Sequence, residues 1–131
     1  MFNCWFQKPD YESEELGKLS KEEVVAYFRG IDRAKWDKET RRREEAKEEF
    51  CPYGFGLNGE NGEFVHIYYD GPGVGGPLTV LVEKRSKKKL LGLIPCAGKA
   101  SRYIEGKSFE ECPAVIEKAY DDFEGLFEFG A

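Results

Sequence analysis

The segment YGFGLNGENGEFVHIYYD, residues 53–70, predicts the central hairpin of a β-sheet. In its first part apolar residues alternate with glycine, which places Tyr53, Phe55 and Leu57 on one face of a strand. The sequence NGENG at 58–62 then favours a tight turn, because Asn-Gly pairs readily adopt the backbone conformations of short hairpin loops. We therefore expect two neighbouring antiparallel strands here.

The returning strand, EFVHIYYD at 63–70, carries large side chains on both faces. One face holds Phe64, His66 and Tyr68, and the other holds Val65, Ile67 and Tyr69. A strand with both faces covered belongs in the interior of a sheet. We expect this strand to be central.

Other segments supply the remaining strands. The alternating FNCWFQ at 2–7 predicts a first strand. LTVLVEKR at 78–85 and KLLGLIP at 89–95 predict a second hairpin around the lysine-rich turn, and LFEFG at 126–130 a short terminal strand. The sequence thus predicts an antiparallel sheet of four to six strands built on a β-meander.

Two segments with the spacing of a capping box, residues 20–23 and 108–111, predict the starts of two helices. The second is followed by an apolar stripe at helical spacing: Cys112, Val115, Ile116, Ala119, Tyr120 and Phe123. A charged segment at 32–50, with opposite charges four residues apart, predicts another helix that ends before Pro52. We expect an α+β fold in which the sheet packs against two to three helices.

The composition fits one globular domain over residues 1–131, in which 40 % of residues are apolar and 15 % aromatic. No apolar run approaches the roughly 20 residues of a membrane helix, and the start of the chain lacks the features of a signal peptide. We therefore expect a cytoplasmic protein with no membrane partner.

The four cysteines are scattered, and His66 is the single histidine. No pair of cysteines has the spacing of a zinc ligand motif, so we expect free thiols at Cys4, Cys51, Cys96 and Cys112. No metal and no cofactor is predicted.

The loop DGPGVGGP, residues 70–77, is rich in glycine but does not have the context of a phosphate-binding loop. Such loops lead from a strand into a helix, whose free N–H groups bind the anion. Here a predicted strand follows, Asp70 adds negative charge, and two prolines lack N–H groups. The loop is interpreted as a connection between strands; a mobile loop at a binding site is the other reading.

Charge is distributed unevenly along a chain of net charge −5. Residues 78–107 carry eight bases and two acids, whereas residues 108–131 carry seven acids and one base. The acidic face of the last helix predicts a docking surface for a partner protein with a basic surface. Its candidate residues are Glu117, Asp121, Asp122 and Glu124.

No motif ties the chain to a family or to a catalytic mechanism. We expect a non-enzymatic protein-binding module, and in a sharper form an inhibitor or immunity protein that occludes a basic toxin or enzyme. One alternative is a nucleic-acid-associated module that binds phosphates with the basic hairpin at 84–89, through Lys84, Arg85, Lys87, Lys88 and Lys89. Another is a small ligand binder or enzyme that uses His66, a cysteine and the loop at 70–77. Both remain open at this point.

Overall fold

The structure is a computed structural model that describes residues 2–70, 77–84, 89–90, 94–95 and 100–129. A six-stranded antiparallel sheet has the strand order β2-β1-β3-β4-β5-β8. Its strands are β1 (Phe2–Gln7), β2 (Ser13–Leu19), β3 (Gly54–Asn58), β4 (Glu63–Tyr69), β5 (Leu78–Lys84) and β8 (Ala100–Lys107). The helices are α1 (Lys21–Arg29), α2 (Arg33–Glu45) and α3 (Cys112–Asp121), and a 3₁₀ helix, η1, spans Phe123–Phe127. The predicted α+β fold is confirmed.

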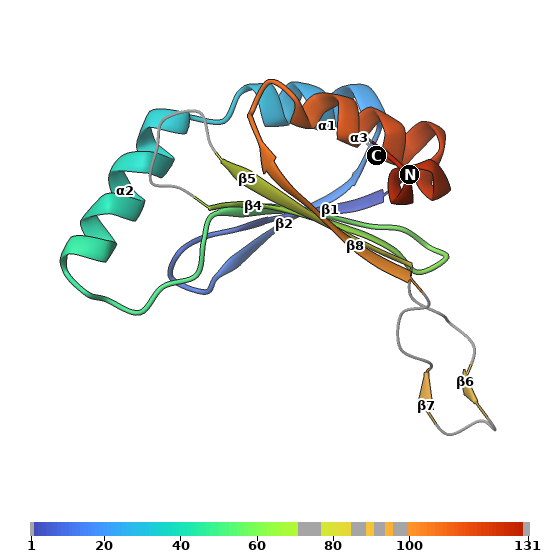
Figure 1. Ribbon diagram of the computed structural model, residues 1–131, viewed down its shortest axis with the longest axis horizontal. Helices are drawn as coiled ribbons and strands as arrows, with labels where there is room; N and C mark the ends of the chain where they lie inside the picture. Colours follow the sequence, from blue (N-terminus) through green and yellow to red (C-terminus); the bar gives the residue numbers. More distant parts are fainter. Residues whose placement is uncertain (1, 71–76, 85–88, 91–93, 96–99, 130–131) are drawn as a thin grey trace.

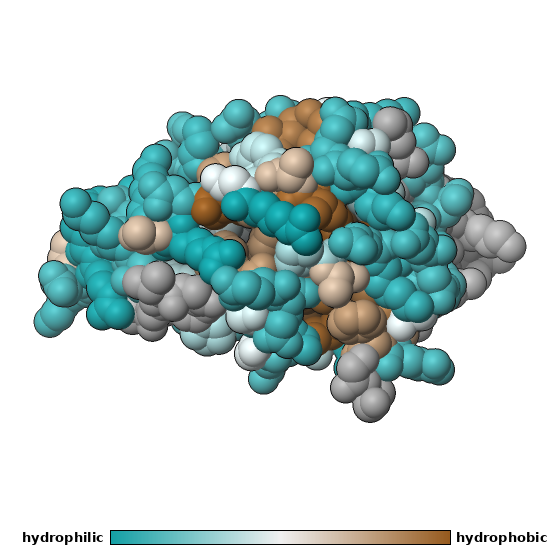
Figure 2. Space-filling view, turned by 90° about the horizontal axis from the view of Figure 1, so that it is seen from above, coloured by the Kyte–Doolittle hydropathy of each residue, from teal (hydrophilic) through white to brown (hydrophobic). Residues whose placement is uncertain are grey.

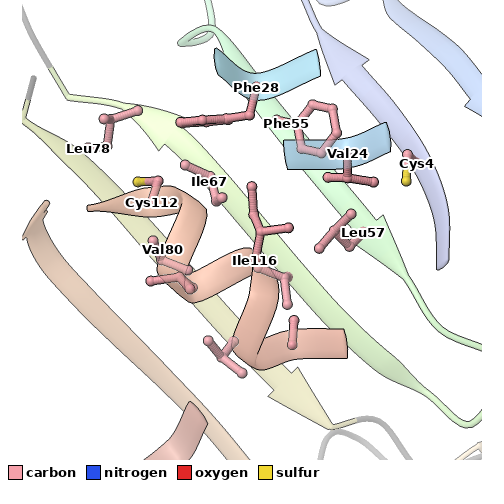
Figure 3. Packing of buried hydrophobic residues seen from close by; sticks show 14 of the residues in the cluster. Cys4, Val24, Phe28, Phe55, Leu57, Ile67, Leu78, Val80, Cys112 and Ile116 are labelled. Carbon is pink, nitrogen blue, oxygen red and sulfur yellow. The ribbon is translucent and has the colours of Figure 1, made fainter. Parts of the chain in front are cut away.

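One face of the sheet packs against the helices, with α1 and α3 side by side above it (Figure 1). Alternate residues of the strands point into this layer, and they meet apolar residues from α1 and α3 (Figure 3). The fully buried side chains include Phe28 of α1, Phe55 of β3, Ile67 of β4 and Ile116 of α3. Burial of each such side chain contributes about 1.5–3 kcal/mol, so this layer is the main source of stability.

The predicted central hairpin is confirmed. Strand β3 pairs with β4 in an antiparallel register, and β4 lies between β3 and β5. The predicted first strand is β1, which pairs with β3 on one side and with β2 on the other.

The second predicted hairpin is wrong. Strand β5 pairs with β8, residues Ala100–Lys107, and the short strands β6 (Lys89–Leu90) and β7 (Ile94–Pro95) pair with each other in a separate two-stranded sheet. The partner of β5 is an edge strand in which Ile104 supplies a buried core side chain. A polar edge strand gives a weak apolar signal, because a charged edge protects a sheet from unwanted pairing.

The capping-box spacing correctly predicts the start of α1 but not that of α3. The hydroxyl of Ser20 accepts a hydrogen bond from the N–H of Glu23, and the carboxylate of Glu23 accepts one from the N–H of Ser20. Ser108 and Glu111 make the same reciprocal pair, but this pair belongs to a turn, and α3 begins directly after it.

The predicted end of the second helix and the predicted terminal strand are both wrong. Helix α2 ends at Glu45, well before Pro52, because Lys47 adopts a positive φ of 54° that cannot continue a right-handed helix. The predicted terminal strand is instead the 3₁₀ helix η1, in which Asp122 caps the N–H of Gly125 and Leu126 is fully buried.

Candidate functional site

The sheet face opposite the helices carries a layer of aromatic side chains. We call it the open face and define it by Trp5 of β1, Phe64, His66 and Tyr68 of β4, Leu81 of β5 and Tyr103 of β8. These residues alternate along their strands with buried core residues, so they point away from α1 and α3. None of the described helices covers this face.

The strand register brings the open-face residues together. Trp5 is paired with Gly56, Gly56 with His66, His66 with Leu81, and Leu81 with Tyr103, so that one row crosses five strands. Because Gly56 has no side chain, the indole of Trp5 lies across β3 and its ring centroid reaches 5.0 Å from that of His66. The rings of Phe64 and Tyr68 lie on either side of His66 along β4, with centroids at 6.2 and 5.3 Å.

His66 is held in its neutral form by these surroundings. Burial lowers the pKa of His66 from 6.5 to about 4. Its Nε2 atom has no hydrogen-bond partner within the described part of the chain, and neither does Nε1 of Trp5. A Cβ atom on Gly54 would lie 2.6 Å from Nε2 of His66, so the imidazole also depends on a glycine in β3. The layer is therefore uncharged and apolar at neutral pH.

Carboxylates lie at two sides of the aromatic layer. Glu15 of β2 lies opposite Trp5 in the strand register, and Glu105 lies two residues after Tyr103 on β8. Both carboxylates are exposed. Burial raises the pKa of Tyr68, and the charges of Asp70 and Glu105 raise it further. Tyr103 itself is 58 % exposed. The open face thus combines an accessible aromatic ring with nearby carboxylates.

The acidic residues predicted for docking lie on the other side of the molecule, on and after α3. Asp121 pairs with Lys21 at 2.9 Å, Asp122 with Lys118 at 3.2 Å and Glu124 with Lys84 at 3.4 Å. Viewed from the helix side, the surface is largely hydrophilic with hydrophobic patches between (Figure 2).

Glu117 is exposed and forms no ion pair with a described residue. The hydrogen bond to Asp121 is the main cause of the raised pKa of Lys21, and the charge of Glu117 adds a small contribution. The structure therefore brings the acidic set together on one side, but compensates most of its charge with nearby lysines.

The predicted basic set is described only in part. Lys84 ends β5, and its ammonium lies 5.7 Å from the ring centroid of Phe123 in addition to its pairing with Glu124. Lys89 begins β6, whereas Arg85, Lys87 and Lys88 lie outside the described residues.

The glycine-rich loop connects two antiparallel neighbours, β4 and β5, as predicted. The N–H of Asp70 donates to the carbonyl of Pro77 at 2.9 Å, and the hydroxyl of Thr79 donates to the carboxylate of Asp70. A strand follows the loop, so no helix N-terminus is available there to hold a phosphate. Residues 71–76 lie outside the described residues.

The described cysteines are free and lie away from His66. Cys4 and Cys112 are buried in the core on the helix side of the sheet, and the thiol of Cys51 donates to the carbonyl of Lys8 at 3.0 Å. Cys96 lies outside the described residues. In the described ranges no three His, Cys, Asp or Glu side chains are arranged to hold a metal ion.

Comparison with known proteins gives no relative: no family model matches the chain, and no curated protein or solved structure is significantly similar to it. Of the helices in the described part, none has the length and apolar character needed to cross a membrane.

Sequence reasoning missed the open face as a candidate site, although its signal was present. Gly54 and Gly56 lie on the open side of β3, next to aromatic residues at alternate positions of β4. Glycines opposite large rings in a central hairpin indicate that a neighbouring side chain lies across the strand. Trp5 could have been assigned to that position only once the register of β1 was known.

Proposed function

We propose that this chain is a protein-binding module whose open face docks a cationic segment of another protein. The observation that carries this proposal is the aromatic layer of Trp5, Phe64, His66 and Tyr68, which none of the described helices covers and which extends to the exposed ring of Tyr103. The rings of this layer are partly exposed and that of Tyr103 is exposed, and apolar surface left open in this way typically marks an interaction site. Aromatic residues, tyrosine above all, are enriched among the residues that dominate binding energy.

The charge near the open face favours a basic partner. Arginine and lysine side chains bind over aromatic rings, and the gain increases when nearby carboxylates complete the charge pairing. Glu15 and Glu105 are placed for this role at the two sides of the layer. The same carboxylates would repel nucleic-acid phosphates, as does the net charge of −5.

One specific form of this function is an inhibitor or immunity protein that covers the active site of a basic toxin or enzyme in the cytoplasm. It is consistent with an acidic chain of this size and with a docking face built on a rigid sheet, because binding sites on sheets lose little conformational freedom on association. The acidic surface predicted on α3 is the alternative docking site for such a basic partner.

The test is capture of partners from a lysate of the organism that encodes the chain, with wild type and three variants. The open-face variant carries Tyr103→Ala, Glu15→Lys and Glu105→Lys. The helix variant carries Glu117→Lys, Asp121→Lys and Asp122→Lys. The matched control is Tyr11→Ala, because Tyr11 is also highly exposed but lies in the β1–β2 connection.

We expect the open-face variant to lose a basic partner that wild type, the helix variant and the control all retain. Affinity measured with that partner should fall at least about tenfold, equivalent to about 1.4 kcal/mol. If the helix variant alone loses the partner, docking uses α3. If the captured ligand is nucleic acid and its binding weakens when the lysines of 84–89 are changed to glutamine, the protein-binding function is wrong.

A further inference from the structure

A cleft of about 530 Å³ lies on the helix side of the molecule, away from the open face. The end of β1 and the residues after it form one side of the cleft. Helices α1 and α2, with the connection between them, and Tyr53, directly before β3, form the rest. Its main lining residues are Phe6, Lys8, Tyr27, Lys35, Trp36 and Tyr53. Small-molecule sites typically have volumes of about 300–1,000 Å³, so the cleft is large enough for one small ligand.

Aromatic rings form the floor of the cleft. Trp36 and Tyr53 are stacked, with centroids 5.0 Å apart and planes at 6° to each other. Phe6 lies 5.9 Å from Trp36 and 6.0 Å from Tyr53. This floor has a fixed shape, because Trp36 and Tyr53 are buried and held by their neighbours on α2 and the sheet. It presents flat apolar surface, which suits a planar ring.

The carboxylates that line the cleft are already engaged by the protein. Asp32 caps α2 by accepting from the N–H of Lys35 at 3.0 Å, and Asp10 accepts from the N–H of Glu12 at 3.1 Å. Glu39 accepts from Arg42 at 2.7 Å and from Arg43 at 2.9 Å, and these pairs lower its pKa to about 2. Each of these carboxylates therefore has at least one hydrogen-bond partner, and Glu39 is also ion-paired.

Arg43 is ion-paired with two glutamates, but the lysine and tyrosine side chains that line the cleft have no such partner among the described residues. Within the described part of the chain, Lys8 and Lys35 form no ion pair, and the hydroxyls of Tyr27 and Tyr53 form no hydrogen bond. Burial raises the pKa of both tyrosines, so both hydroxyls keep their protons and remain donors. Beside an apolar floor, the cleft thus offers two ammonium groups and two phenols without partners in the described ranges, and together these donors can hold an anionic acceptor.

We propose that this cleft binds a small planar aromatic ligand that carries a carboxylate. The ring lies against the floor of Phe6, Trp36 and Tyr53, and the carboxylate lies between the ammonium groups of Lys8 and Lys35. Binding here is independent of docking on the open face, because no residue that defines the open face lines the cleft.

The test uses 2-naphthoate as the probe, with 2-naphthamide and the (2-naphthylmethyl)ammonium ion as ring-matched neutral and cationic compounds. Amide and side-chain NMR signals of the full chain report both affinity and location. We expect saturable binding of 2-naphthoate at least about tenfold tighter than that of 2-naphthamide. The shifts should map to Tyr27, Trp36 and Tyr53, and the ammonium compound should bind weakest.

Charge removal supplies the second arm. Lys8→Gln and Lys35→Gln should each reduce the affinity for 2-naphthoate several-fold and leave that for 2-naphthamide unchanged. Lys38→Gln is the matched control, because Lys38 is an exposed lysine of α2 that does not line the cleft, and it should change neither affinity. Tyr103→Ala should also change neither affinity.

Three outcomes would overturn the proposal. The first is no saturable binding of 2-naphthoate at millimolar concentration. The second is equal affinity for the acid and the amide. The third is a set of shifts confined to the open face. None of these outcomes bears on capture of a protein partner, so the two proposals fail separately.

Discussion

Gly56 lies directly beneath the indole of Trp5, so close that a Cβ atom on Gly56 would be 1.9 Å from Cε2 of Trp5. The absence of a side chain at this position allows a residue of β1 to reach across β3 to His66 of β4. The aromatic layer of the open face therefore depends on a glycine as much as on its rings.

Gly56→Ala should lower the free energy of unfolding by about 1–3 kcal/mol, because the added methyl group displaces Trp5 from the layer. Urea denaturation monitored by tryptophan fluorescence measures the change. Gly30→Ala is the control: a Cβ atom there would meet its nearest neighbours at 3.5 Å, an ordinary contact, and stability should change little.

A double-mutant cycle tests the cause of that loss. In a Trp5→Leu background, Gly56→Ala should cost much less than in wild type, because the smaller side chain leaves room for the methyl group. Strictly additive effects of the two substitutions would show that Gly56 is required for a reason other than its contact with Trp5.

His66 should make stability depend on pH in a defined window. Its folded pKa of about 4 lies below its unfolded value of 6.5, so the unfolded state binds the proton more readily. The free energy of unfolding should therefore fall as pH drops from neutral, by roughly 2 kcal/mol at about pH 5. Denaturant melts at several pH values measure this dependence.

His66→Gln supplies the control, because glutamine does not titrate and His66 is the single histidine of the chain. The variant should lose most of the pH dependence between about pH 7 and pH 5, a range in which carboxylates titrate little. An unchanged slope in this variant would mean that His66 binds its proton as readily in the folded as in the unfolded protein and that the layer is more open to water.

Tyr69→Phe should destabilise the junction between β4 and α2. The buried hydroxyl of Tyr69 donates to Oδ1 of Asp37 at 3.0 Å, while Nε of Arg41 donates to Oδ2 at 2.8 Å. Removing a hydrogen bond to a charged group costs about 1.5–3 kcal/mol of unfolding free energy. Thermal and urea denaturation should show this loss for Tyr69→Phe but not for Tyr103→Phe, whose hydroxyl lies on an exposed side chain. Equal stability of the two variants would contradict the role of Asp37 as a buried acceptor.

The interior of the sheet could be predicted from sequence, and its edges could not. Strands β3, β4 and β5 alternate apolar side chains at every second position and bury them against the helices. The edge strand β2, SEELGKL, has Leu16 and Leu19 as its apolar side chains, and β8, ASRYIEGK, is similarly polar. Charged edges suppress pairing between molecules, and the same charges remove the alternation by which a strand is recognised.

Only some residues of the candidate site could be predicted from the sequence. The sequence placed His66, Phe64 and Tyr68 on one face of a central strand, but the contribution of Trp5 and Tyr103 depends on a register that spans about a hundred residues. The charge of the acidic residues on α3 could be predicted, but the compensation of that charge could not, because the lysine that pairs with Asp121 is Lys21, far away in the chain.

Photo-cross-linking in the native cell tests the open-face proposal most directly. A photoreactive phenylalanine analogue is placed at position 103 on the open face, at position 117 on α3, or at position 11 as an exposed control. We expect a cross-link to one protein from position 103, at a peptide that contains arginine or lysine, and none from positions 117 or 11. A cross-link to a partner protein from position 117, with none from position 103, would contradict the open-face proposal.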